Sequence, residues 1–296
     1  MWTILRFFHL FGLPLVTRAF LTTSLSHHSP PTSTTLLYHH QAKKLWGQGD
    51  EEAFDVEAVR QRLESILTTS GGSHHPSSTR THAYHAHPSA AISPPLDVVL
   101  PTPPPPTALD RVRRFREQEL LEKLKEGDEA LTDLWDFWFQ ERGTHAAACL
   151  VQAEELTGQG PSYWPQAEII LAALIEEYGV YWAEPVNRLA TLYFIQGRFE
   201  DSETLCQIVL AVKPWHFGAL SGIVMVYESL RESQKARQWA ARRLPTFAPK
   251  GNNRRRQEWV KNALKDSQAA IEDAERRLQE WMGPKDDYTS LTNAWQ

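Results

Sequence analysis

Residues that could carry chemistry are few, and most have a simpler explanation. The paired acids Glu154-Glu155 and Glu176-Glu177 lie in helical patterns. A solvated helix face accounts for them, because a general acid needs a pocket that shifts its pKa. The chain has no Gly-rich phosphate loop, no paired spacing of metal ligands and no Gly-x-Ser-x-Gly nucleophile elbow. We therefore expect a protein that is not an enzyme and that holds neither a cofactor nor a metal ion.

The densest group of versatile side chains is residues 213–218, which read Lys-Pro-Trp-His-Phe-Gly. The favoured interpretation is a turn between helical units, with Trp215 and Phe217 wedged between two layers. The alternative places Trp215 and His216 on the rim of a binding surface, where their side chains would contact a partner.

Charge is distributed unevenly along the 296 residues. All 36 acidic residues lie from Asp50 onward. A body this acidic is a poor general binder of nucleic acid, because that affinity depends largely on neutralising phosphates. A local basic patch would override this average. The charged residues before Asp50 are four cations: Arg6, Arg18, Lys43 and Lys44.

The two cysteines, Cys149 and Cys206, lie in apolar helical patterns. A free cysteine packs like a small hydrophobic residue, so both are expected in the core. A disulfide framework or a zinc site would need more cysteines or a Cys–His spacing, and the sequence has neither. A reducing compartment fits this usage best.

The first 49 residues have the composition of a targeting leader. Residues 1–19 join a basic start at Arg6 to a short apolar run and small residues, which is the layout of a signal peptide and is too short for a membrane span. Residues 20–49 lack acids and are rich in Ser, Thr and His, as transit peptides are. The junction Thr17-Arg18-Ala19-Phe20 resembles the bipartite plastid-targeting leader of diatoms and related algae, in which the signal peptide is cut before an aromatic residue. The resemblance implies a plastid protein, with the secretory pathway and the mitochondrion as alternatives.

Two segments connect this leader to the helical body. Residues 50–69 carry one apolar stripe at helical spacing and predict a lone amphipathic helix. Residues 70–107 are rich in Pro, His and Ser, and such a composition cannot bury enough apolar surface to offset its ordering entropy. We expect a disordered linker there, whose histidines belong to a polar tether rather than to a metal site.

From residue 108 the sequence becomes helical and nearly free of Gly and Pro. Residues 108–143 predict a helix pair. Its second helix places Trp135, Trp138 and Phe139 at the spacing of a single buried face. Three aromatic side chains on one stripe could form a ligand cage, but a hydrophobic core is the favoured interpretation.

A unit of 34 residues then repeats, most clearly over residues 183–216. Ala190 and Ser202 are small enough to let two antiparallel helices approach closely, and Gly197 takes a turn that a β-carbon would obstruct. Pro214 cannot continue a helix and closes the unit. The larger apolar positions, which fill the layers, are Val186, Leu189, Tyr193, Phe199, Cys206 and Val209.

This unit resembles the consensus of tetratricopeptide repeats (TPRs) nearly position for position. Residues 217–244 repeat it with departures at Arg231, Ser233 and Arg243. An earlier unit fits if about five residues are inserted within residues 157–162. The resemblance covers residues 144–244. It implies a short solenoid of TPR-like antiparallel helix pairs that works by binding a protein or peptide.

In TPR arrays the first helix of each unit lines a concave groove, and the resemblance implies that a partner binds there. Asn and basic residues at such places often clamp a peptide backbone or carboxylate, so Asn187 and Arg188 are the first candidates. The alternative is an ordinary solvated face. The positions expected on the groove or its rim are Asn187, Arg188, Thr191, Ser221, Met225 and His216.

Residues 245–282 are expected to close the array, because a solenoid needs a terminal helix with one polar face. The start of this helix carries a basic cluster of Arg254, Arg255 and Arg256. The cluster is either a solvated helix start or a patch for nucleic acid, which would make the chain an RNA-associated factor. Residues 283–296 read as a flexible tail. The predicted fold is therefore all-α, a short α-solenoid with a long C-terminal capping helix, preceded by a disordered N-terminal region.

Overall fold

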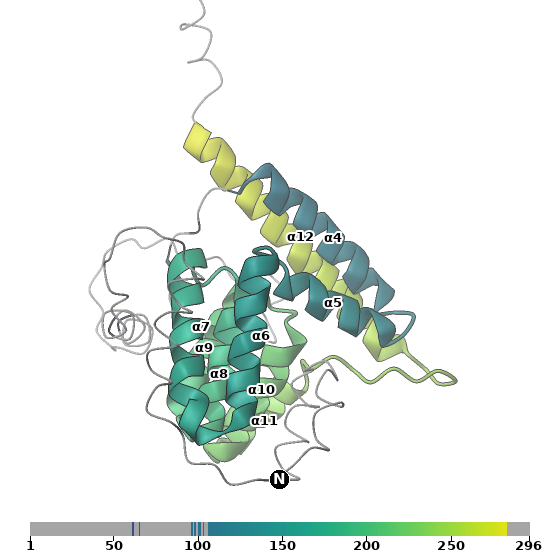
Figure 1. Ribbon diagram of the computed structural model, residues 1–296. Helices are drawn as coiled ribbons and strands as arrows, with labels where there is room; N and C mark the ends of the chain where they lie inside the picture. Colours follow the sequence, from purple (N-terminus) through teal and green to yellow (C-terminus); the bar gives the residue numbers. More distant parts are fainter. Residues whose placement is uncertain are drawn as a thin grey trace, which may run out of the picture.

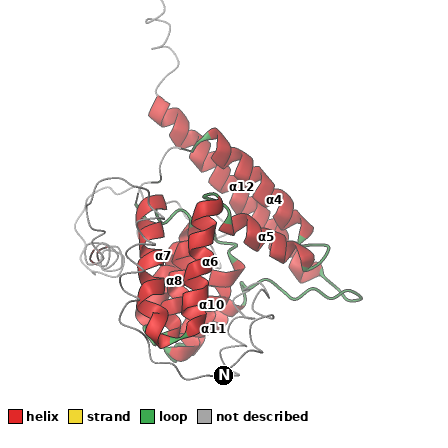
Figure 2. Ribbon diagram, viewed as in Figure 1, coloured by secondary structure: helices red, strands yellow, loops and turns green. Residues whose placement is uncertain are grey.

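A computed structural model describes residues 61, 65, 96, 98, 100, 101, 103 and 106–282. The expectations for the leader, for nearly all of residues 50–107 and for the tail 283–296 fall outside the described residues. The regular structure of the described part is helical (Figure 2), and none of its helices is long and apolar enough to cross a membrane.

Six helices form three antiparallel pairs that stack side by side (Figure 1). Within each pair the two helices pack along their length, and each pair also packs on the next. The arrangement confirms the predicted all-α solenoid of TPR-like helix pairs. The pairs are α6 (Thr144–Gln159) with α7 (Trp164–Tyr178), α8 (Ala183–Ile195) with α9 (Phe199–Val212), and α10 (Phe217–Ser229) with α11 (Ser233–Ala240).

The second pair shows why the repeat residues are suited to their positions. The side chains of Ala190 and Ser202 are buried between α8 and α9, and the Ser202 hydroxyl donates to the Ala190 carbonyl at 2.7 Å. Gly197 turns the chain with φ of 79°. Arg231 stands at the equivalent turn of the next pair and has φ of 62°. A non-glycine residue in this left-handed region costs about 1–2 kcal/mol, so the third unit is locally strained.

The first pair is longer than the others at its turn. After α6 the chain passes through Gly160, which has φ of 108°, and through a short 3₁₀ turn, Pro161–Tyr163. The Trp164 indole then donates to the Thr157 carbonyl at 3.2 Å and folds the extra residues back onto α6. The extra turn overlaps the predicted insertion within residues 157–162.

Three further helices form a layer across one end of the repeats (Figure 1). They are α4 (Ala108–Lys123), α5 (Glu129–Phe139) and α12 (Arg254–Met282). Thr107 and Asp110 form a capping box that fixes the start of α4. Helices α4 and α12 run antiparallel. Arg114 donates to the Ala270 carbonyl at 3.0 Å, and Arg256 at the start of α12 donates to the Leu124 carbonyl at the end of α4. This layer joins the two ends of the described body.

The long C-terminal helix therefore exists as expected, but its apolar stripe covers α4. Val260, Ala263, Ile271 and Ala274 are buried along α12, and the principal packing partner of α12 is α4 rather than the last repeat. The exposed face of α11 is polar in its own sequence, because Gln234, Lys235, Arg237 and Gln238 lie there. The last repeat thus needs no apolar cover on that face.

A short piece of the predicted linker is attached to the body. Leu96, Val98 and Leu100 are half-buried and pack against the core, and the Tyr181 hydroxyl donates to the Pro101 carbonyl. The linker expectation therefore does not hold for these described residues. Three apolar side chains at alternate positions supply the buried surface that the rest of the linker composition lacks.

Candidate functional site

The structure places the predicted groove residues of α8 inside the protein. Asn187, Arg188 and Thr191 are only 1%, 4% and 5% exposed. The Thr191 hydroxyl donates to the Asn187 carbonyl at 3.0 Å, so it is satisfied within the helix. The expectation that these side chains face solvent is wrong. The reason is that α5, which lies outside the repeats, packs across the beginning of α8.

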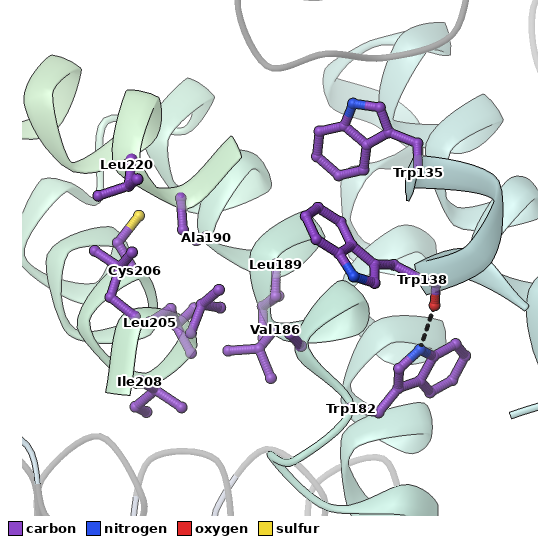
Figure 3. Close-up of a cluster of buried hydrophobic side chains, with 14 of the residues drawn as sticks. Trp135, Trp138, Trp182, Val186, Leu189, Ala190, Leu205, Cys206, Ile208 and Leu220 are labelled. Atoms are coloured by element: carbon purple, nitrogen blue, oxygen red, sulfur yellow. Dashed lines mark hydrogen bonds between the residues drawn. The ribbon is translucent and has the colours of Figure 1, made fainter. Parts of the chain in front are cut away.

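The aromatic side chains of α5 fill the end of the groove. Trp135 and Trp138 are 3% and 0% exposed, and Phe139 is buried as well. Trp135 lies against α10 so closely that a β-carbon added at Gly218 would stand 2.6 Å from the Trp135 ring. The Trp182 indole donates to the Trp138 carbonyl at 2.9 Å (Figure 3). These rings are core, as the favoured interpretation of the aromatic stripe predicted.

Arg188 is held between these rings and two acids. Its guanidinium carbon lies 4.9 Å from the Trp135 ring centroid and 4.8 Å from that of Phe139. Its nitrogens lie 2.9 Å from a Glu154 carboxylate oxygen and 3.3 Å from one of Glu184. These are ion pairs without well-directed hydrogen bonds. Burial raises the pKa of Glu154, and the Arg188 charge opposes that rise. Arg188, on α8, therefore links α8 to α5 and α6 through buried contacts.

His216 is also structural rather than part of a rim. It is 0% exposed, stacks on Trp138 with ring centroids 4.7 Å apart, and accepts a hydrogen bond from the Ala219 amide at its Nδ1, which caps α10. Because Nδ1 accepts, the neutral imidazole carries its proton on Nε2 and donates to Glu184 at 3.0 Å. The alternative that placed His216 on a rim is therefore wrong, and the burial of His216 and Trp215 agrees with the favoured interpretation of a packed turn between units.

A buried ionic cluster fixes the same turn to α4. The carboxylate oxygen Oε1 of Glu117 accepts from the indoles of Trp138 and Trp215 at 2.6 and 3.0 Å, and from the Lys213 ammonium at 3.2 Å. Lys213 also contacts Glu141 at 3.1 Å. Burial alone would raise the pKa of Glu117, but the Lys213 charge and the indole donors outweigh it, so its pKa lies below the ordinary value. We call these four side chains and Glu141 the Glu117 cluster.

Sequence reasoning missed Glu117, although a signal existed. Glu117 stands three, four and seven residues before Leu120, Leu121 and Leu124, which are buried in the last turn of α4 and at its C-cap. A carboxylate at such a position predicts a buried partner, because an unpaired buried charge is too costly to keep. The partner itself, Lys213, lies 96 residues away and could not be identified from the pattern.

Two of the predicted groove positions remain accessible. Ser221 and Met225 on α10 are partly exposed. They occupy the same places in their unit as Asn187 and Thr191 do in theirs, 34 residues earlier. If Ala146 and Leu150 of the first unit are matched with Val186 and Ala190, 40 residues later, then Val151 on α6 matches Thr191. Val151 is therefore also equivalent to Met225, and it is 45% exposed. We call the surface formed by the first helices of the three pairs the first-helix face. Where it is accessible, it carries one apolar side chain on α6 and another on α10.

The three arginines at the start of α12 have different surroundings. Arg254 is exposed and pairs with Glu258 at 3.1 Å on its own helix, and Arg255 is also exposed. Arg256 is 1% exposed. It donates to the carbonyls of Leu124, Gly127 and Pro245 and pairs with Asp128. The expectation that Arg256 belongs to a nucleic-acid patch is wrong, because it ties α12 to the end of α4.

The other chemically versatile residues are buried or scattered. Both cysteines are free and buried. Burial raises the pKa of the Cys149 thiol and raises that of Cys206 to about 12, so both are thiols rather than thiolates near neutral pH. Within the described residues, no group of three or more His, Cys, Asp or Glu side chains is placed to hold a metal ion.

Comparison with known proteins agrees with the repeat. A TPR repeat-containing protein from Rhizobium etli is 40% identical to this chain over 53 residues, which are 18% of this chain and 26% of that protein. The chain thus matches about a quarter of that relative. No family model matches the sequence, and no solved structure matches it. Over the matched stretch, the chain is similar to a TPR repeat protein.

Proposed function

We propose that this chain is a non-catalytic adaptor or assembly factor of TPR type that captures a protein segment on its first-helix face. The observation that carries the proposal is the pair of accessible apolar side chains at equivalent positions, Val151 on α6 and Met225 on α10. Ser221 lies one turn before Met225 and supplies a polar contact. A protein segment with apolar side chains fits this face, because apolar anchors supply most of the binding energy at protein interfaces.

The aromatic end of the groove is unsuited to a transient partner. Trp135, Trp138 and Phe139 together bury several hundred square ångströms, at about 25 cal/mol for each square ångström of apolar surface. Displacing α5 would also break the Arg188 and Glu117 contacts. A partner would have to supply all of this energy. We therefore assign binding to the accessible face and a permanent structural role to α5.

The test is affinity purification from the native cell, comparing a Val151→Glu/Met225→Glu double variant with the unaltered chain. We expect the double variant to lose proteins that the unaltered chain recovers, because two charges replace the apolar contacts. Gln234→Glu on the exposed side of α11 is the matched control and should keep those proteins. Recovery of the same proteins by the double variant, with an unchanged circular dichroism spectrum, would contradict the assignment.

We further propose that the adaptor acts in a plastid. Support comes from the order of the leader, in which a signal-peptide layout precedes Phe20 and an acid-free segment. A fluorescent fusion that carries the leader should enter the plastid, and Phe20→Ala should hold it in the secretory pathway. Plastid import that does not depend on Phe20 would contradict the prediction of a bipartite leader that is cut before an aromatic residue.

RNA association is the second candidate function. It no longer depends on Arg256, which is buried, but a wider set of exposed cations supports it.

A further inference from the structure

Opposite charges are separated along the folded body. Residues 231–265 contain eleven Lys and Arg residues and two Glu. Residues 126–204 contain fifteen acidic residues and three basic ones. The first stretch comprises all of α11, the segment after it and the first three turns of α12. The body is therefore acidic from α5 through most of the second repeat, and strongly basic from α11 through the first turns of α12.

The basic stretch folds so that its parts adjoin. The Trp259 indole of α12 donates to the Arg242 carbonyl at 2.8 Å, and Arg256 donates to the Pro245 carbonyl at 3.0 Å. These two bonds bring the segment that follows α11 against the first turns of α12. We call the exposed cations of this region the basic surface: Arg231, Lys235, Arg237, Arg243, Lys250, Arg254, Arg255, Lys261 and Lys265.

The basic surface is poorly neutralised by the protein itself. Among the described residues, Arg254 is its only member within ion-pair distance of a carboxylate, and that carboxylate is Glu258 on the same helix. Lys235 contacts a ring instead, 5.2 Å from the centroid of Tyr227. Like charges gathered in one region repel one another, and a bound polyanion would relieve that repulsion.

The kind of partner follows from what the surface lacks. No large apolar side chain is exposed in residues 231–265. Trp239 is 1% exposed, and the Trp259 indole is already bonded to the main chain. A protein interface normally needs an aromatic or aliphatic anchor at its centre, and base stacking needs an exposed ring. Binding to a nucleic-acid backbone needs neither, because it depends on cations that displace counterions from phosphates.

We propose that the basic surface binds the phosphate backbone of a nucleic acid without preference for base sequence. This ligand is separate from the protein segment assigned to the first-helix face, so either proposal can fail without the other. If about six of the nine cations contact phosphates, the logarithm of affinity for duplex DNA falls with the logarithm of salt concentration at a slope of about −5. Affinity then drops roughly 10³-fold between about 50 and 200 mM salt.

The experiment measures fluorescence anisotropy of labelled duplex DNA and single-stranded RNA, each about 30 nucleotides long, titrated with the full chain over that salt range. We expect both probes to bind, with the same affinity for unrelated sequences. Arg254→Gln/Arg255→Gln should make the salt slope shallower by about two, since each lost phosphate contact removes about one. No binding near 50 mM salt, or a slope unchanged in this variant, would overturn the proposal.

The matched control is Arg116→Gln/Arg276→Gln, which also removes two exposed charges. Both of these arginines pair with a carboxylate of their own helix, as Arg254 does, but they lie outside the basic surface. Their loss should leave the slope unchanged, and an equal effect of both variants would refute a localised site. Poly-glutamate is the competing ligand. If it displaces the nucleic acid at equal charge concentration, the surface instead recognises an acidic protein.

Discussion

Replacing Glu117 with glutamine tests whether the buried charge of this residue holds the α4–α5 layer on the repeats. The amide keeps the shape of the side chain and an oxygen that can accept from Trp138 and Trp215. It removes the negative charge, so Glu141 becomes the one carboxylate of these two that still pairs with Lys213. Breaking a buried ion pair costs about 3–5 kcal/mol. Because Glu141 remains, we expect Glu117→Gln to lower the free energy of unfolding by about 3 kcal/mol.

Urea unfolding, followed by circular dichroism and tryptophan fluorescence, measures this loss. Glu119→Gln is the control. Glu119 lies two residues away on the same helix and forms an exposed pair with Arg116, so its loss should change stability by less than about 1 kcal/mol. Equal midpoints for the two variants would refute the reasoning. Lys213→Met should also cost less in the Glu117→Gln background than in the unaltered chain, because the two charges are coupled.

The pH dependence gives a second readout of the same charge. The pKa of Glu117 in the folded protein lies below its ordinary 4.5. A lowered pKa contributes stability that is fully present above the ordinary value and is lost as pH falls through the folded value. The unaltered chain should therefore lose more stability than Glu117→Gln as pH decreases below about 4.5. Parallel curves of melting temperature against pH would contradict this.

Two further substitutions test other contacts. Arg256→Ala leaves Asp128 and the carbonyls that follow α4 without their buried partner, and should lower the free energy of unfolding by about 3 kcal/mol. Arg255→Ala, on the exposed side, should stay within about 0.5 kcal/mol of the unaltered chain. Similar losses for both variants would refute a structural role for the Arg256 contacts. Arg231→Gly should raise stability by about 0.5–1 kcal/mol, because glycine adopts the φ of 62° without strain. A lower melting temperature for that variant would show that the Arg231 side chain matters more than its backbone.

The repeats could be predicted because their signals are local and periodic. Ala190, Gly197 and Ser202 have roles set by contacts within one helix pair, and the structure places them as expected. The exposure of the groove could not be predicted in the same way. Whether Arg188 faces water depends on where α5 docks, and Trp135 lies 53 residues away in sequence. No periodicity within the repeats encodes that contact.

The basic cluster shows a signal that was present but overlooked. Arg256 stands four and seven residues before Val260 and Ala263, which are buried on α12. Helical spacing therefore places Arg256 on the buried face and Arg254 and Arg255 away from it. The carbonyl partners on Gly127 and Leu124 could not be deduced, because main-chain acceptors at a helix end carry no sequence signature.

The pairing of α4 with α12 has a consequence for the newly made chain. The Arg114–Ala270 bond joins residues 156 positions apart, so the ribosome completes all three repeats before it supplies the partner of α4. Contacts within each repeat are local and form early in translation. During that interval α4 lacks the helix that finally packs along it. The nascent protein thus passes through a stage in which the three repeats are complete but α4 is not yet packed along α12, which is the stage at which a chaperone would be most useful.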